Sequence, residues 1–303
     1  GEKRKSSQRI MLLFSHMSFW SALVGNKEKS VLGVDIGSSS LKVVQLRKEH
    51  GKPVLETYGE LALGPYGGAE VGQATNLSAE QVTETLQDLI REAKVTTKSA
   101  GVSIPFARSL LTLVALPYRK DEQEQKTVIE LEARKYIPVP VSEVQLDWFI
   151  LPSDDPSAKD KPHDKAEVLL VAVHNDELAF LQQIAKGAGL EASFYEIEIF
   201  STIRAVVEEH VKPVLVLDIG ASSTKAYVVE HGVVAFSHNI PQGGQDVTRT
   251  IAESHGVSID RAETMKKENG FASMGTATGG YDAKAIELVF SRIFDEARRV
   301  LTQ

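Results

Sequence analysis

One pattern of residues occurs twice in this chain, and this repeat limits the available folds more than any other feature. Residues 31–42 read VLGVDIGSSSLK, and residues 214–225 read VLVLDIGASSTK. Six of the eight positions from Asp to Lys are identical in the two copies. In each copy an apolar run, typical of a buried strand, leads to a carboxylate, a glycine and small hydroxyl residues. The repeat therefore predicts two similar lobes that clamp one nucleotide between two phosphate-binding turns.

The similarity continues beyond each turn. We predict a hairpin after both, with strands at residues 41–47, 53–63, 225–229 and 233–238. The tip is Glu-His-Gly in both hairpins, and its glycine supplies the positive φ that a tight turn requires. A single copy would be better explained by an ordinary turn between strands, but two copies with matching flanks favour duplication of a three-stranded unit.

The residue types in the turns suit phosphate binding. Glycine allows the backbone to approach a phosphate closely, and successive N–H groups form a concave anion site. Serine hydroxyls add donors, and one lysine per turn adds a positive charge. The predicted nucleotide-binding residues of the turns are Asp35, Gly37, Ser38, Ser39, Ser40, Lys42, Asp218, Gly220, Ala221, Ser222, Ser223 and Lys225.

The two aspartates need a separate explanation, because a carboxylate repels phosphate. A hydrated Mg²⁺ between carboxylate and phosphates resolves the conflict, so we predict that Asp35 and Asp218 hold Mg²⁺ through water. Ser39 and Ser40 lack an evident base, which argues against a nucleophile, and we assign no catalytic residue. The histidines show no ligand spacing, so we expect no metal site built from them.

Composition sets the remaining limits. A chain of 303 residues with 42% apolar and 25% charged residues can form two globular domains. The net charge of −7 argues against a general affinity for nucleic acid. Zero cysteines exclude disulfides and thiolate metal sites. The longest apolar runs are too short for a membrane-spanning helix.

The residues between the turns predict a mixed α/β fold with an insertion. Ser78 and Gln81 form a capping box for a helix, and a strand follows at 101–105. We then predict a β-α-β-β-α unit, with strands at 110–116, 144–151 and 167–174, one helix to about residue 136, and one that Asn175 caps. A charged loop is expected at 152–165 and a long helix at 283–301.

These elements predict the domain organisation. We expect an N-terminal extension (1–29), a first lobe in two parts (30–105 and 188–213), an inserted subdomain (106–187) and a second lobe (214–303). Residues 1–16 precede a plausible start at Met17 and are left out of the fold prediction. A second lobe equivalent to the first would end in further strands, so we expect it to be incomplete at Gln303.

The paired turns and their hairpins resemble those of the superfamily of actin and the sugar kinases. Within it, residues 129–138 and 243–249, with Ala262, Glu263 and Lys266, resemble the PilM family of type IV pilus assembly and, more distantly, FtsA. The resemblance covers about residues 29–301. It implies an actin-like, ribonuclease H-like fold of two lobes, with the β-α-β-β-α subdomain inserted in the first lobe.

The resemblance also implies ATP and Mg²⁺ as cofactors. It places Gly243 and Gly244 near the phosphate or ribose, and Glu263 and Lys266 beside ribose and adenine. For Glu263 and Lys266 the simpler alternative is a surface ion pair worth ~0.2–0.5 kcal/mol. The chain departs from the family in one respect, since no glycine-rich adenosine motif follows the last helix.

The implied function is a cytoplasmic, ATP-binding scaffold at the inner face of the membrane, with at most weak ATPase activity. Its partner would be the N-terminal tail of a PilN-like membrane protein, bound between the first lobe and the insert. Other platform proteins, the pilus ATPases and self-association are further candidates. The alternatives are an FtsA-like or MreB-like polymerising protein and, with less support, a sugar kinase, for which no sugar-binding motif is evident.

Overall fold

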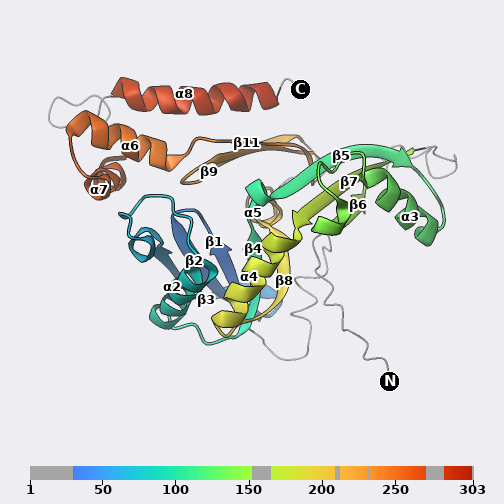
Figure 1. Ribbon diagram of the computed structural model, residues 1–303, viewed down its shortest axis with the longest axis horizontal. Coiled ribbons are helices and arrows are strands. Elements are labelled where there is room, and N and C mark those ends of the chain that lie inside the picture. Colours follow the sequence, from blue (N-terminus) through green and yellow to red (C-terminus); the bar gives the residue numbers. More distant parts are fainter. Residues whose placement is uncertain (1–29, 152–164, 209–211, 231, 271–282, 302–303) are drawn as a thin grey trace.

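The computed structural model describes residues 30–151, 165–208, 212–230, 232–270 and 283–301. They form two lobes and a smaller sheet beside them (Figure 1). This arrangement confirms the predicted mixed α/β class. None of the helices within these ranges is long and apolar enough to cross a membrane. The predicted extension at 1–29, the loop at 152–164 and His231 lie outside the described residues.

The first lobe contains a five-stranded sheet. Its order is β3 (Lys52–Ala62), β2 (Ser40–Glu49), β1 (Ser30–Ile36), β4 (Ser99–Ile104) and β8 (Glu191–Ile197). β1 pairs antiparallel with β2 and parallel with β4, which pairs parallel with β8. The helices α2 (Ala79–Glu92) and α4 (Asn175–Gly187) pack against each other and against this sheet. The parallel central strands therefore end at a common edge, on which the site is built.

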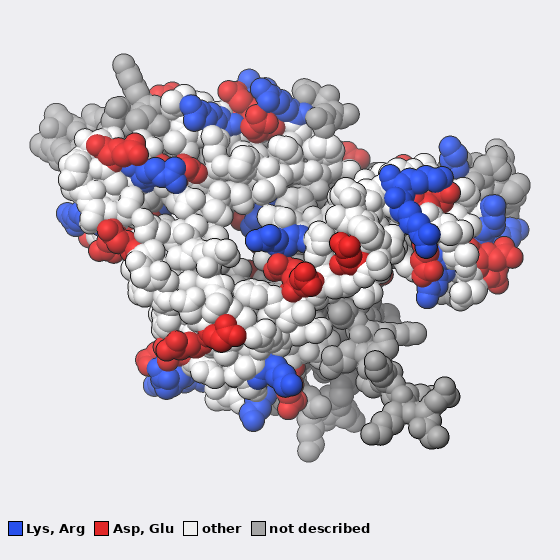
Figure 2. All heavy atoms as spheres, in the orientation of Figure 1, with Lys and Arg blue, Asp and Glu red and all other residues white. Residues whose placement is uncertain are grey.

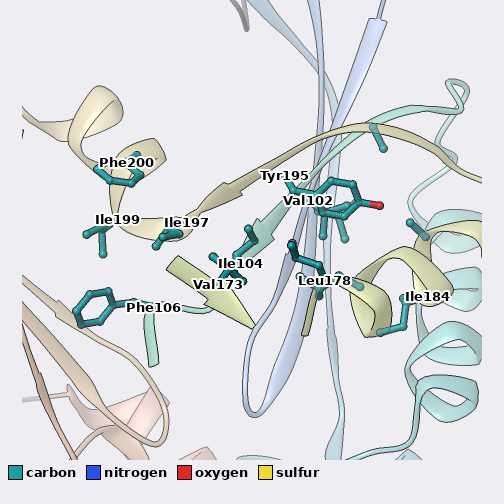
Figure 3. Packing of buried hydrophobic residues seen from close by; sticks show 14 of the residues in the cluster. Val102, Ile104, Phe106, Val173, Leu178, Ile184, Tyr195, Ile197, Ile199 and Phe200 are labelled. Atoms are coloured by element: carbon teal, nitrogen blue, oxygen red, sulfur yellow. The ribbon is translucent and has the colours of Figure 1, made fainter. Parts of the chain in front are cut away.

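The core of this lobe is apolar and continuous from the sheet to the helices. Figure 3 shows Val102 and Ile104 of β4 close to Leu178 of α4 and to Tyr195 and Ile197 of β8. These side chains are at most 5% exposed. Their burial removes apolar surface from water at roughly 25 cal/mol per Å², which is the main term that fixes the strands in place.

Local sequence signals account for α2 and for the first hairpin. Ser78 accepts from the backbone N–H of Gln81, and the Gln81 side chain accepts from the N–H of Ser78, which confirms the predicted capping box. At the hairpin tip, His50 and Gly51 both have positive φ, at 48° and 82°. The second hairpin has the same feature at Gly232, with φ at 79°.

The second lobe repeats the first three strands. β9 (Val214–Ile219), β10 (Thr224–Glu230) and β11 (Val233–Ile240) form a sheet in the order β11-β10-β9. The registers are equivalent, because Asp35 lies opposite Lys42 and Asp218 lies opposite Lys225. The helices α6 (Gly244–His255) and α7 (Ile259–Asn269) follow, and α8 (Ala283–Val300) packs on β10 and β11.

The insert forms a separate antiparallel sheet. β5 (Ser109–Pro117), β7 (Lys165–His174) and β6 (Val144–Ile150) lie in that order, and α3 (Glu122–Ala133) packs through Ile129 and Ala133 against Leu116 and Leu170. Helix α4 leaves this sheet and packs on the first lobe. The predicted order β-α-β-β-α is observed, and the domain boundaries stay a prediction.

Two details differ from the sequence prediction. Asn175 does not cap α4: it is the first helical residue after His174, and its side-chain amide donates to the Ser142 carbonyl, 2.9 Å away. β8 and α5 (Glu198–Val206) were not anticipated. The sequence of β8, EASFYEI, mixes glutamates with apolar residues and lacks a clear period of two, so its pairing with β4 decides its conformation.

Candidate functional site

The two turns lie on the same cleft between the lobes. This cleft has a volume of about 990 Å³, and all twelve turn residues predicted above line it. The turns come from equivalent strands, β1–β2 in the first lobe and β9–β10 in the second. The structure thus brings together residues that are separated by almost two hundred positions in the sequence.

The backbone of the two turns is nearly identical. The N–H of Gly37 donates to the Ser40 carbonyl at 3.0 Å, and that of Gly220 donates to the Ser223 carbonyl at 2.9 Å. A Cβ on either glycine would meet that carbonyl oxygen at 2.9 Å, which only glycine avoids. In each turn, two N–H groups donate to nothing within the described chain: those of Ser38 and Ser39, and those of Ala221 and Ser222. These four donors suit phosphate oxygens.

The two charged side chains of the first turn, Asp35 and Lys42, are partly open to solvent. Asp35 accepts a hydrogen bond from the Ser103 hydroxyl at 2.6 Å, and its other oxygen lies 4.0 Å from the Lys42 ammonium. Lys42 also donates to the Ser40 hydroxyl at 3.1 Å. With half of its side chain exposed, this lysine is accessible to an anionic ligand in the cleft.

The second turn differs, because its lysine is paired with carboxylates from both lobes. Lys225 donates to Asp218 at 3.0 Å and to Glu198 at 2.8 Å. Glu198 begins α5 in the first lobe, and its other oxygen accepts from the N–H of Phe106 at 2.7 Å. Burial by itself lowers the pKa of Lys225, but the two carboxylates outweigh it and raise that pKa above its ordinary value.

Sequence reasoning missed Ser103 and Glu198. Both lie at the carboxyl ends of parallel strands, β4 and β8, where open α/β sheets generally place ligand sites. The Ile104-Pro105 strand end could have directed attention to Ser103, whereas Glu198 follows a strand that was not predicted. Further polar lining residues, also not anticipated, are Asn76, Arg108, Asp176, Glu177, Ser201 and Thr202.

Figure 2 shows Lys and Arg side chains lying among Asp and Glu side chains on the face in view. In the cleft the acidic residues are in excess, which disfavours an anionic ligand that brings no cation with it. The residues that line the cleft include five carboxylates and only three cationic side chains. Among the residues that the structure describes, no three acidic or histidine side chains converge closely enough to hold a metal ion directly. A cation here would therefore keep most of its water shell, and Asp35 and Asp218 are the turn carboxylates that could hold it through water.

Gly243 and Gly244 lie behind the second turn and do not line the cleft. The N–H of Gly244 donates to the Gly220 carbonyl at 2.8 Å. A Cβ at position 243 would meet the carbonyl oxygens of Gly220 and Ala221 at 2.5 and 2.6 Å. Close packing of the α6 N-terminus on the turn thus accounts for this glycine, and its proposed contact with nucleotide stays a prediction.

Glu263 and Lys266 belong to a buried network between α6 and α7. Glu263, which is 7% exposed, lies 2.5 Å from the Lys266 ammonium and accepts from the Thr248 hydroxyl at 2.7 Å. Burial raises the pKa of Glu263, but these hydrogen bonds and the lysine charges together hold it below its ordinary value. Glu263 and Lys266 are therefore not a surface ion pair, which was the simpler alternative. Their role beside ribose and adenine stays a prediction.

A loop of the first lobe, residues 63–77, connects the two turns; we call it the strap. The N–H of Thr75 donates to the Ser38 carbonyl at 2.9 Å, and that of Ala74 donates to the Gln245 side chain at 3.2 Å. The N–H of Gln245 in turn donates to the Ala221 carbonyl at 2.9 Å. The strap therefore makes a continuous hydrogen-bonded path from one turn to the other.

Comparisons with known proteins agree with this geometry. The family model for type IV pilus assembly protein PilM matches residues 33–276. The chain is 24% identical over 265 residues to cell division protein FtsA of Neisseria meningitidis serogroup B (strain ATCC BAA-335 / MC58), a match that covers 82% of this chain and 64% of that protein. The chain thus spans less than two thirds of this relative's length.

Among solved structures, the chain is similar to one titled "PilM-PilN type IV pilus biogenesis complex". The TM-score is 0.71 and the identity is 24%, over 90% of this chain and 76% of that chain. At this identity the similarity concerns the fold, and it confirms the predicted actin-like architecture.

Proposed function

The chain belongs to the type IV pilus assembly protein PilM family, and on this premise we propose that it is a nucleotide-binding scaffold of the pilus assembly platform. The observation that carries the proposal is the convergence of both turns on one cleft. A volume of about 990 Å³ is in the range of small-molecule sites, roughly 300–1,000 Å³. The proposed ligand is ATP with Mg²⁺.

The proposed roles follow from the donors and charges of the cleft. The four unpaired N–H groups and Lys42 would contact the phosphates. Asp35 and Asp218 would orient water molecules on Mg²⁺, which supplies the positive charge that the acidic cleft lacks. We assign the protein at most a slow hydrolysis of ATP.

Isothermal titration of the purified protein with ATP, with and without Mg²⁺, tests this proposal. We expect Asp35→Ala and Asp218→Ala to weaken Mg²⁺-ATP binding strongly while the unfolding transition stays nearly unchanged. Glu253→Ala, an exposed carboxylate on α6, is the matched control and should bind as the parent does. Equal affinity with and without Mg²⁺ in the parent would contradict the assigned roles.

The proposed partner is the cytoplasmic N-terminal tail of a PilN-like membrane protein. The cleft extends to Arg108, Asp176 and Glu177, where the start of the insert meets the start of α4. Arg108 lies 3.9 Å from Glu177 and is largely exposed, so charged groups are available to an extended chain at this junction. Other platform proteins and the pilus ATPases are further proposed partners.

A fluorescently labelled peptide with the sequence of that tail tests the partner. Saturable binding that Arg108→Ala weakens would support a peptide site at the junction of the insert and α4, and absence of saturable binding would contradict it.

The proposed location is the cytoplasm, where the partner would hold the protein at the inner face of the membrane. Filaments that sediment in the presence of ATP would instead favour the polymerising alternative suggested by the FtsA similarity.

A further inference from the structure

The lysines of the two turns occupy equivalent positions but different environments. Each lies opposite the aspartate of its own turn in the strand register. Even so, 49% of the Lys42 side chain is exposed and only 14% of the Lys225 side chain. Lys42 is 4.0 Å from its aspartate, whereas Lys225 is 3.0 Å from its own. The repeat therefore has one accessible and one sequestered ammonium group.

Of the two lysines, Lys225 alone contacts Glu198. This glutamate comes from the first lobe and contacts Lys225 of the second lobe at 2.8 Å, across the cleft. Its orientation is fixed, because its other oxygen accepts from the N–H of Phe106 at 2.7 Å. The side chain of Glu198 is only 18% exposed, so water screens this ion pair less than it screens the pair at Lys42.

We propose that Glu198 gates the second turn: in the nucleotide-free protein it pairs with Lys225 beside that turn, and the phosphates must displace this carboxylate to reach the lysine. This inference rests on the proposed nucleotide function. In the first turn, Lys42 is half exposed and no described carboxylate lies closer to it than 3.8 Å, so it is the more accessible lysine for the phosphates. Lys225 joins them only after it leaves Glu198. Because Glu198 and Lys225 belong to different lobes, breaking the pair links phosphate binding to a change in the contact between lobes.

A double-mutant cycle tests the gate. Glu198→Gln keeps the size of the side chain and the acceptor for Phe106 but removes the charge that retains Lys225. We expect it to tighten Mg²⁺-ATP binding by about 5- to 10-fold. Lys225→Met should weaken binding, and adding Glu198→Gln to Lys225→Met should give no gain. Glu60→Gln, which removes the carboxylate 3.8 Å from the exposed Lys42, is the matched control and should change affinity little.

Two outcomes of the cycle overturn the proposal. If Glu198→Gln tightens binding equally in the Lys225→Met background, the effect is a general loss of negative charge and no gate exists. If Glu198→Gln weakens binding, Glu198 assists the nucleotide directly. Unfolding curves of each variant show whether the fold is intact before affinities are compared.

A second readout does not depend on nucleotide. Acetylation of lysines in the free protein, followed by mass spectrometry, reports how accessible and unpaired each amine is. In the parent we expect Lys225 to react more slowly than Lys42, and Glu198→Gln should accelerate Lys225 alone by about 5-fold or more. Unchanged Lys225 reactivity would refute the gate. Failure of ATP to bind the parent would refute the nucleotide function. The acetylation rates would still report on the Glu198–Lys225 pair, because they are measured without nucleotide.

Discussion

The carboxylate of Glu70 accepts a hydrogen bond from the backbone N–H of Asp260 at 2.6 Å, which joins the strap of the first lobe to the start of α7 in the second. The first N–H groups of a helix have no partner within the helix, and a carboxylate there also favours the helix dipole. Close to this contact, Gly72 of the strap lies against Glu263, where a Cβ would meet the Glu263 Cγ at 2.7 Å. The strap thus ties both lobes on one side of the cleft.

Glu70→Ala should loosen this connection. The lost interaction is worth about 0.3–1 kcal/mol, since Glu70 is exposed and salt screens it. Hydrogen–deuterium exchange should accelerate at strap amides 72–77 and in the first turn of α7, with little change in α2. Glu253→Ala serves as the control, and exchange in the strap identical to the parent's would contradict its role as a tie.

Tyr66 anchors the same strap to α2. Its hydroxyl donates to Asp88 at 2.7 Å, and this hydrogen bond, aided by burial, raises the pKa of Tyr66 to about 12. A raised pKa means that the phenol stabilises the fold fully below its unfolded value near 10 and loses this contribution as the pH rises toward 12. Tyr66→Phe should cost about 0.5–1.5 kcal/mol at neutral pH.

Chemical denaturation of the parent and Tyr66→Phe at pH 7 and in steps above pH 10 measures this contribution. The stability difference should shrink as the alkaline range is entered. A difference that stays constant across that range would mean that the hydrogen bond to Asp88 is not its source.

Gly243→Ala should distort the second turn without touching the cleft directly. The new Cβ would lie 2.5 Å from the Gly220 carbonyl oxygen, so backbone must move. Overpacking of this kind costs typically about 1–3 kcal/mol. Gly33→Ala is the control, because its Cβ would meet nothing closer than 3.7 Å. Thermal unfolding should separate the two variants, and equal melting temperatures would argue against tight packing of α6 on the turn.

Glu263 makes stability depend on pH in the acid range. Its folded-state pKa lies below the ordinary value of 4.5, so its contribution is complete above that value and is lost as the pH falls through the folded-state pKa. Glu263→Gln should cost on the order of 1–3 kcal/mol at pH 7, because a buried charged hydrogen bond to Lys266 is lost. Urea denaturation between pH 7 and pH 3 should show the difference shrinking on acidification. If the loss of unfolding free energy stayed the same at every pH, altered packing and not the charge of Glu263 would be its cause.

Features encoded by neighbouring residues were predictable. The capping box at Ser78 and Gln81 depends on four consecutive positions, and the hairpin tip at Gly51 depends on one residue's freedom at positive φ. The turns themselves were predictable for the same reason. The glycine, carboxylate and hydroxyl residues of each turn are close neighbours in the sequence, so the two flanking strands alone set their relative positions.

Features that depend on distant residues were not predictable. Asn175 has the residue type of a cap, yet its amide binds Ser142, which lies on the insert. Glu198 gives no signal in the sequence, since its partner Lys225 comes from the other lobe. Gly243 and Glu263 were noticed, but the structure surrounds them with protein groups, because the N-terminus of α6 packs on the second turn.

The sequence by itself determined that two equivalent turns exist and which donors and charges each presents, because the repeat places the same residue types on the same strand-turn-strand path. Only the tertiary structure decided that the lysines of the two turns have different ion pairs and different exposure. A helix of the first lobe brings Glu198 to Lys225, and nothing brings a comparable carboxylate so close to Lys42 among the residues described. Charge pairing across a cleft depends on how two lobes pack, and that packing is a property of the whole fold.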